Sequence, residues 1–163
     1  GTSPHLTAEL FKLKAGVQMS QVLFKGSGPA YVSLIAGEVP VAFSTVLSAM
    51  PHVKNGRIRA LGVTTKKRVA VMPEVPTIAE SALPGFESSQ WFGILAPART
   101  PRAIVDRLNA AIAKSSSTPE MKARFAADAV EVVNSTPEEF SDVIRRELDQ
   151  WAKVIKAAGI VPQ

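Results

Sequence analysis

Residues 24–30 read Phe-Lys-Gly-Ser-Gly-Pro-Ala, and this stretch decides the fold that we expect for the 163-residue chain. The apolar residues 22–24 are typical of the end of a strand, and Pro29 suits the first position of a helix. Between them, Gly26 and Gly28 leave the backbone N–H groups uncovered by side chains. Because the first N–H groups of a helix lack internal acceptors and carry partial positive charge, this corner is suited to hold an anion. The alternative is a tight strand-to-helix turn that binds nothing.

The same order of strand, corner and helix recurs along the first half of the chain. Ser3-Pro4 and Ser44-Thr45 are helix-start signals. Short strands are predicted at residues 19–24, 40–43 and 57–63, which indicates βα units on a parallel sheet. In such sheets the strand-to-helix corners share the edge where ligands bind. The residues predicted to converge there on one carboxylate or phosphate are Thr2, Ser3, Gly26, Ser27, Gly28, Ser44 and Thr45.

The rest of the chain is expected to be an irregular connector followed by a mainly helical part. Prolines punctuate the connector at residues 68–84, with one short helix near residues 77–81. Further strands are predicted at residues 86–97 and 130–133. The last helix has an apolar face that includes Trp151 and should be buried. Helix starts are marked by Thr100-Pro101, Thr118-Pro119 and Thr136-Pro137, the last pair forming a capping box with Glu139.

Composition excludes several functional classes. Hydrophobic residues make up 46% of the chain and charged residues 20%, as in globular proteins, and no apolar run is long enough to cross a bilayer. The net charge is +5, but the densest basic run, residues 66–68, has no interleaved aromatic residues, so nucleic acid is not an expected partner. The chain has no cysteine, and its two histidines, His5 and His52, accompany no recognisable nucleophile, base and acid. No catalytic residue, metal site or cofactor is therefore predicted.

Short pieces along nearly the whole chain stand in the order found in one known family. They are Pro4-His5-Leu6, residues 24–30, Ala49-Met50-Pro51-His52-Val53, residues 59–64, Pro73-Glu74-Val75-Pro76-Thr77, Leu83-Pro84-Gly85-Phe86, Trp91-Phe92-Gly93 and residues 151–155. With these pieces the chain resembles the periplasmic substrate-binding proteins of tripartite tricarboxylate transporters, also called the Bug family. Two departures leave the ligand preference open: Phe24 stands where relatives usually have Tyr, and Ser44 where they often have an acidic residue.

The resemblance implies a type II periplasmic-binding-protein fold, in which two α/β lobes with parallel-type sheets and flanking helices close over a small organic acid. It further implies that residues 1–88 are the second lobe, which carries the carboxylate-binding corners. Residues 89–163 are then the mainly helical returning segment of the first lobe. Family members carry a longer N-terminal part with a signal peptide, which this chain lacks, and they lie in the periplasm. Trp91, at the crossover between the lobes, is expected either to line the cleft or to be part of the core.

Three functional hypotheses follow. The first is a solute-binding protein, or a fragment of one, that holds a carboxylate by backbone N–H groups and hydroxyls and delivers it to the membrane components of a transporter. The second is a truncated chain that serves as an assembly domain and forms a homodimer, because half of the cleft is missing. The third, an enzyme on the same fold, is disfavoured by the scarcity of histidine and the absence of cysteine.

Overall fold

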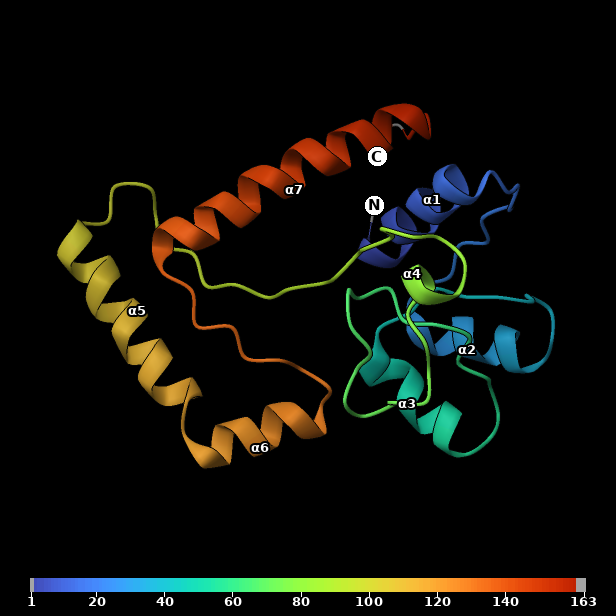
Figure 1. Ribbon diagram of the computed structural model, residues 1–163, viewed down its shortest axis with the longest axis horizontal. Helices are drawn as coiled ribbons and strands as arrows, with labels where there is room; N and C mark the ends of the chain where they lie inside the picture. The colour runs from blue at the N-terminus through green and yellow to red at the C-terminus, as the bar shows by residue number, and fades with distance from the viewer. Residues whose placement is uncertain (1, 161–163) are drawn as a thin grey trace. The chain divides into compact units, whose positions relative to one another are not determined.

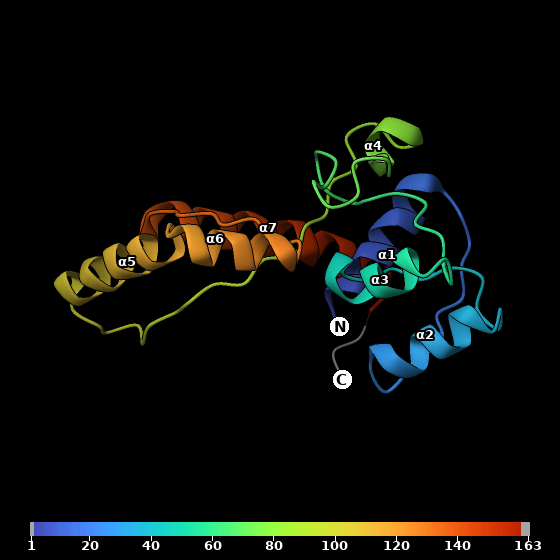
Figure 2. The same ribbon diagram turned by 90° about the horizontal axis from the view of Figure 1, so that it is seen from below.

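The computed structural model describes residues 2–160 and forms seven helices within that range (Figures 1 and 2). They are α1 (Ser3–Ala15), α2 (Ser27–Ile35), α3 (Val46–Lys54), α4 (Ile78–Ser81), α5 (Arg102–Ser116), α6 (Pro119–Ala127) and α7 (Pro137–Ala157). The described residues fall into two compact units. The first unit lies within residues 1–90 and 154–163, and the second unit comprises residues 91–153.

Several helices begin where the sequence predicts. The hydroxyl of Thr118 accepts a hydrogen bond from Met121 N at 3.4 Å at the start of α6. Before α7, Thr136 N donates to Glu139 Oε2 at 2.8 Å and Glu139 N donates to Thr136 Oγ1 at 3.2 Å. These contacts satisfy N–H groups that the helix itself leaves without acceptors, so the predicted capping box is confirmed.

Three helix starts differ from the prediction. Thr2 rather than Ser3 is the N-cap of α1, and Pro101 rather than Thr100 is the N-cap of α5. Pro29 is the third residue of α2 and not the first, because Gly26 already takes the N-cap position. The φ angle of Gly26 is +107°, which a residue with a side chain rarely adopts, so the glycine allows the chain to turn into the helix at that point.

The predicted strands do not form. Within residues 2–160 the one β-pairing is an isolated parallel bridge between Val63 and Thr77, with Val63 N bonded to Pro76 O and Ile78 N to Val63 O, both at 2.9 Å. The segments concerned are residues 19–24, 40–43, 57–63, 86–97 and 130–133. A strand needs a neighbour that pairs its backbone groups along several residues, and apart from the contacts of Val63 and a hydrogen bond from Ser88 N to Thr64 O these segments have no such pairing in the described chain. The parallel sheet of the expected α/β fold is therefore not confirmed.

The first unit has one buried apolar cluster and two further residues that are more deeply buried. Val63, Met72 and Val75 form one cluster, and residues of α3 pack against it. Phe86 and Thr77 are the most deeply buried residues, with 1% and 2% of their surface exposed. Because the bridge at Val63 and Thr77 joins the connector to the segment before it, this part of the unit is held by both burial and hydrogen bonds.

Helix α1 is attached to the first unit by aromatic and polar contacts. The ring of Phe11 lies 5.6 Å from that of Phe43 and 6.0 Å from that of Phe86, in the latter case edge to face. The hydroxyls of Thr7 and Ser88 are 2.7 Å apart, and both residues are buried. Burying these hydroxyls is tolerated because each is the hydrogen-bond partner of the other.

Helix α4 is short but closed by a complete capping box. Glu80 N donates to Thr77 Oγ1 at 3.0 Å, and Thr77 N donates to Glu80 Oε2 at 2.8 Å. Arg68 adds two-pronged hydrogen bonds to the same carboxylate. The Arg68 hydrogen bonds, with that from Thr77 N, lower the pKa of Glu80 to about 2, because they favour the ionised form.

The second unit is held by contacts between its helices and two extended segments. Trp91 packs edge to face on Phe140 of α7, with ring centroids 5.0 Å apart. Gly93 lies directly against the same phenylalanine ring. Asn109 Nδ2 of α5 donates to Ser135 O at 2.9 Å, which fixes the segment that leads into α7. Arg102 at the start of α5 forms an ion pair with Glu138.

Large apolar side chains remain exposed where strands were predicted. Leu23 is 73% exposed, Leu61 66% and Phe92 84%.

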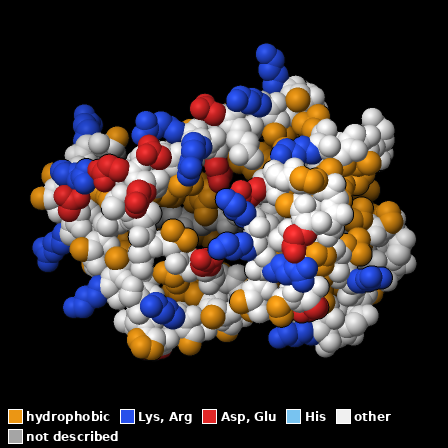
Figure 3. Space-filling model, in the orientation of Figure 1, with side chains coloured by type: hydrophobic (Ala, Val, Ile, Leu, Met, Phe, Trp, Pro, Cys, Tyr) orange, Lys and Arg blue, Asp and Glu red, His pale blue; other side chains and the backbone are white. Residues whose placement is uncertain are grey.

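On α7, Leu148 is 65% exposed, so the expectation that the apolar face of the last helix is buried is wrong at that position, while Trp151 is half-buried. Hydrophobic side chains are visible among the charged ones on the face shown in Figure 3. No helix within residues 2–160 has the length and apolar character needed to cross a membrane.

Candidate functional site

The start of α2 offers uncovered backbone donors. Gly26 at the N-cap provides no side-chain acceptor, and the N–H groups of Ser27 and Gly28 take part in none of the hydrogen bonds of the described chain. Residues 21–29 are all exposed, and a Cβ placed on Gly28 would meet no atom within 4 Å. A small anion therefore has room to reach these donors.

The start of α3 is built differently. Thr45 Oγ1 accepts a hydrogen bond from Ser48 N at 3.3 Å and lies 2.5 Å from Ser48 Oγ, so this hydroxyl caps the helix. Ser44, the residue before it, is exposed, and its Oγ lies 2.5 Å from Tyr31 Oη. Of the two hydroxyls predicted at this corner, Ser44 is the one whose side chain is not used to close the helix.

Tyr31 links α2 to α3 and to the residue before the N-cap of α3. It lies in the second turn of α2, and helical side chains lean toward the N-terminus of their helix. Its hydroxyl lies 2.5 Å from Ser44 Oγ, and its ring lies tilted against His52 of α3 with centroids 4.5 Å apart. Sequence reasoning missed Tyr31, although it is the only tyrosine of the chain and follows the glycine corner directly.

The other predicted residues are placed elsewhere. Thr2 and Ser3 are exposed at the start of α1, and no hydrogen bond or ion pair of the described residues joins their side chains to Ser44 or to the α2 corner. His5, near this start, has its Nε2 3.9 Å from Glu9 Oε1. Trp91 belongs to the second unit, where it packs on Phe140 and is 40% exposed.

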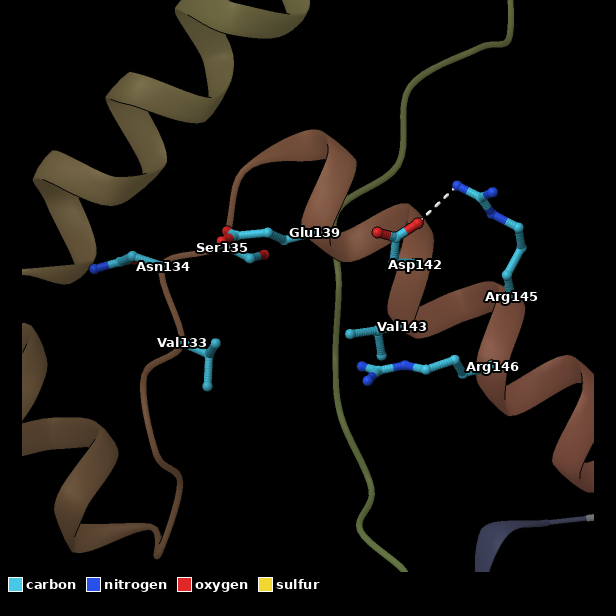
Figure 4. A pocket seen from close by; sticks show the side chains of 8 residues that line it. All are labelled: Val133, Asn134, Ser135, Glu139, Asp142, Val143, Arg145 and Arg146. Carbon is cyan, nitrogen blue, oxygen red and sulfur yellow. Dashed lines mark hydrogen bonds and ion pairs between the residues drawn. The ribbon is translucent and has the colours of Figure 1, made fainter.

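A separate hollow of about 830 Å³ lies in the second unit, where no site residue was predicted apart from Trp91. Figure 4 shows Val143 and Arg146 extending from α7 toward the segment that carries Val133. Asp142 and Arg145 form an ion pair of 2.7 Å at its rim. The mixture of both charges makes this hollow a poorer anion site than the α2 corner. Among the described residues, no group of His, Asp and Glu side chains is arranged to hold a metal ion.

Solved structures of periplasmic binding proteins match this chain over most of its length. "R. palustris Rpa4515 with adipate" is 35% identical with a TM-score of 0.86, and the match covers all of this chain and 55% of that one. The periplasmic binding protein BugD is 29% identical with a TM-score of 0.80, covering 98% and 54%. "MatC (Rpa3494) from Rhodopseudomonas palustris with bound malate" is 28% identical with a TM-score of 0.75, covering 93% and 53%. The fold of the described chain is thus consistent with about half of a periplasmic binding protein.

Sequence relatives identify the family. The sequence pattern of the tripartite tricarboxylate transporter family receptor, TctC, matches residues 1–160, and the chain belongs to this family. Protein BugT of Bordetella pertussis is 34% identical over 98% of this chain and 49% of its own length. A UPF0065 protein in the tcbD-tcbE intergenic region of Pseudomonas sp. strain P51 is 40% identical, covering 95% and 46%. The chain spans about half the length of these relatives.

One relative is of similar length to this chain. The UPF0065 protein in the clcB-clcD intergenic region of Pseudomonas knackmussii is 36% identical over 95% of this chain and 92% of its own length.

Proposed function

We propose that this chain is the ligand-binding part of a periplasmic solute-binding protein that captures a small organic carboxylate for a tripartite tricarboxylate transporter. The observation that carries this proposal is the start of α2, where uncovered N–H groups face open space. The exposed Ser44 hydroxyl, which is linked to α2 through Tyr31, is proposed as a further donor. The solved relatives named with adipate and malate support a carboxylate as the ligand class.

The proposed chemistry is binding without reaction. Backbone N–H groups of Ser27 and Gly28 and the hydroxyl of Ser44 donate to the carboxylate, and the partial positive charge of each helix start contributes about 0.3–1 kcal/mol. Thr2, Ser3, Thr45 and Trp91 stay predictions as further contacts. The family is a receptor family, and we propose that the ligand passes unchanged to the membrane components of the transporter.

The proposal also assigns each part of the chain to a lobe. Residues 1–88 supply the carboxylate-binding lobe, and residues 89–163 supply part of the other lobe. Because the chain spans about half the length of BugT, the remaining part of the cleft is proposed to come from polypeptide that this chain does not match.

Replacing Gly28 by valine tests the proposal. A carboxylate at about 100 times its Kd should raise the melting temperature of the original chain by about 5–10 °C. The new Cβ would meet no atom within 4 Å beyond its own helix backbone and chain neighbours, and we expect the added methyl groups to obstruct access to the N–H groups. We therefore expect a folded variant with no thermal shift, measured by scanning fluorimetry with adipate and malate.

Ala123→Val, at an exposed position of α6, is the matched control for adding a valine to a helix of the same length. It should keep the full shift. Melting curves of the original chain that stay flat across mono-, di- and tricarboxylates would contradict carboxylate capture.

A second candidate, self-assembly, is favoured by the exposed apolar segment at the start of the second unit. Phe92 is 84% exposed, and Ile94 and Leu95 are each 73% exposed. No backbone hydrogen bond of the described chain involves residues 91–96, so this segment presents an unpaired edge. Such an edge can pair with the same segment of a second copy.

Light scattering at micromolar concentration tests this candidate. A homodimer should have twice the 17.4 kDa mass of one chain, and Ile94→Asp should convert it to a monomer by placing a charge in the interface. Leu148→Asp, on the exposed face of α7, should leave the mass unchanged. A stable monomer of the original chain would rule the assembly role out.

A further inference from the structure

The burial of Tyr31 favours one direction for its hydrogen bond with Ser44. Tyr31 is 6% exposed, and Ser44 Oγ, at 2.5 Å, is the one hydrogen-bond partner of its hydroxyl in the described chain. A buried phenol hydrogen without an acceptor is costly, and no buried side-chain polar atom of the described residues is unpaired. The distance alone fits either direction, and from the burial of Tyr31 we infer that its hydroxyl donates and Ser44 Oγ accepts.

This direction leaves the Ser44 hydroxyl hydrogen free. Ser44 is exposed, and its Oγ forms no other hydrogen bond within the described residues. A serine hydroxyl that accepts one hydrogen bond becomes a better donor of its own, because successive hydrogen bonds polarise one another. The remaining donor of Ser44 thus faces solvent and not another protein group.

The phenol that fixes Ser44 is itself held rigidly. The ring of Tyr31 lies tilted against His52, with centroids 4.5 Å apart and an angle of 35° between the planes. The His52 imidazole comes from α3 and the Tyr31 ring from α2, so the contact joins the two helices. A rigid supporting group reduces the side-chain freedom that Ser44 would lose on binding a ligand.

We propose that Tyr31 is a positioning residue for carboxylate recognition, which orients the Ser44 hydroxyl so that its hydrogen is donated to a ligand carboxylate oxygen. This inference rests on the proposed function. It adds a residue that contacts Ser44 and does not contact the ligand itself. The hydroxyl at position 44 is neutral, so it stabilises a carboxylate by one directed hydrogen bond and without an ion pair.

A double-mutant cycle tests the inference in the full chain. Tyr31→Phe keeps the ring and its stacking on His52 but removes the donor, and Ser44→Ala removes the ligand contact. A hydrogen bond to a charged group is worth about 10- to 100-fold in affinity, so we expect each variant to bind adipate or malate at least about tenfold more weakly by calorimetry. The double variant should bind as weakly as Ser44→Ala alone, because Tyr31 acts only through Ser44.

Two further variants separate positioning from a merely structural role. Ser44→Thr keeps a hydroxyl at the same place and should retain most of the affinity. Ser33→Ala, on the same helix, removes another buried hydroxyl, which donates to Glu38 Oε2 at 2.8 Å, and should leave the affinity unchanged.

The single tyrosine also gives a direct spectroscopic signal. With 3-fluorotyrosine incorporated, the chain should give one ¹⁹F resonance, since Tyr31 is its only tyrosine. Adipate should shift this resonance in the original chain and leave it unmoved in Ser44→Ala. Additive losses, or full affinity in Tyr31→Phe, would overturn the positioning role while leaving carboxylate binding intact. The absence of both heat and ¹⁹F shift with adipate and malate in the original chain would overturn both.

Discussion

Replacing Gly93 by alanine is expected to destabilise the second unit by about 3 kcal/mol. A Cβ at this position would lie 2.7 Å from Phe140 Cε1 and 3.1 Å from Cε2, and closer still to Cζ. Such contacts force the ring or the backbone to move, and overpacking of this kind costs about 1–3 kcal/mol and occasionally more. The ring has little freedom to move, because Trp91 packs edge to face on it.

Urea unfolding followed by Trp91 fluorescence measures this effect, with Trp151→Phe as the background so that a single tryptophan reports on the second unit. Gly28→Ala is the matched control, since its new Cβ has no atom within 4 Å. Shortening the opposing side chain in Gly93→Ala/Phe140→Leu should recover part of the loss. An unfolding midpoint that does not move in Gly93→Ala would show that the segment does not pack on α7 in solution.

Phe86→Ala is expected to lower the free energy of unfolding of the first unit by about 3–5 kcal/mol. Phe86 is 1% exposed, its ring meets that of Phe11 edge to face, and the ammonium group of Lys14 lies 6.0 Å from its centroid. Truncation removes the ring that anchors α1 and leaves a cavity that the neighbouring side chains fill only in part.

Amide hydrogen exchange of residues 7–10 in α1 measures this loss separately from the second unit. Phe92→Ala is the matched control, because the same side chain is deleted where it is 84% exposed, and the change should be within about 0.5 kcal/mol. Equal protection factors in Phe86→Ala and the original chain would contradict the role of Phe86 as an anchor.

Helix positions could be predicted from the sequence because the signals are local. The Thr118 cap and the Thr136 capping box involve residues three positions apart, so their chemistry is visible in a short window. The glycine corner before α2 was predicted for the same reason. Its helix begins two residues earlier than expected, because Pro29 is compatible with several positions of the first turn.

Strands could not be settled in the same way, because pairing depends on distant segments. Leu23, Leu61 and Ile94 lie in sequences that suit strands, yet each is exposed by more than half in the described chain. Their sequences favour a half-buried strand that is paired with another strand. The segment itself does not show which other strand that would be. These side chains are exposed because no partner segment in the described chain covers them.

The candidate site was predicted in part for a related reason. The exposed glycines and Ser44 follow from helix-start chemistry, whereas the role of Tyr31 depends on a contact 13 positions away along the chain. The hollow beside Val133 and Arg146 combines two distant segments and was not predicted at all. A single tyrosine in a short helix does not indicate a binding site unless its contact with Ser44 is known.

Under the proposed function, the pairing of Tyr31 with Ser44 limits how ligand preference can be engineered. Any residue at position 44 that offers no acceptor, such as alanine, valine or lysine, leaves the buried phenol without a partner and is penalised before a ligand is present. A library that varies position 44 alone would therefore select for acceptors and under-sample new specificities. Varying positions 31 and 44 together removes this bias, so the two residues are best treated as one design variable.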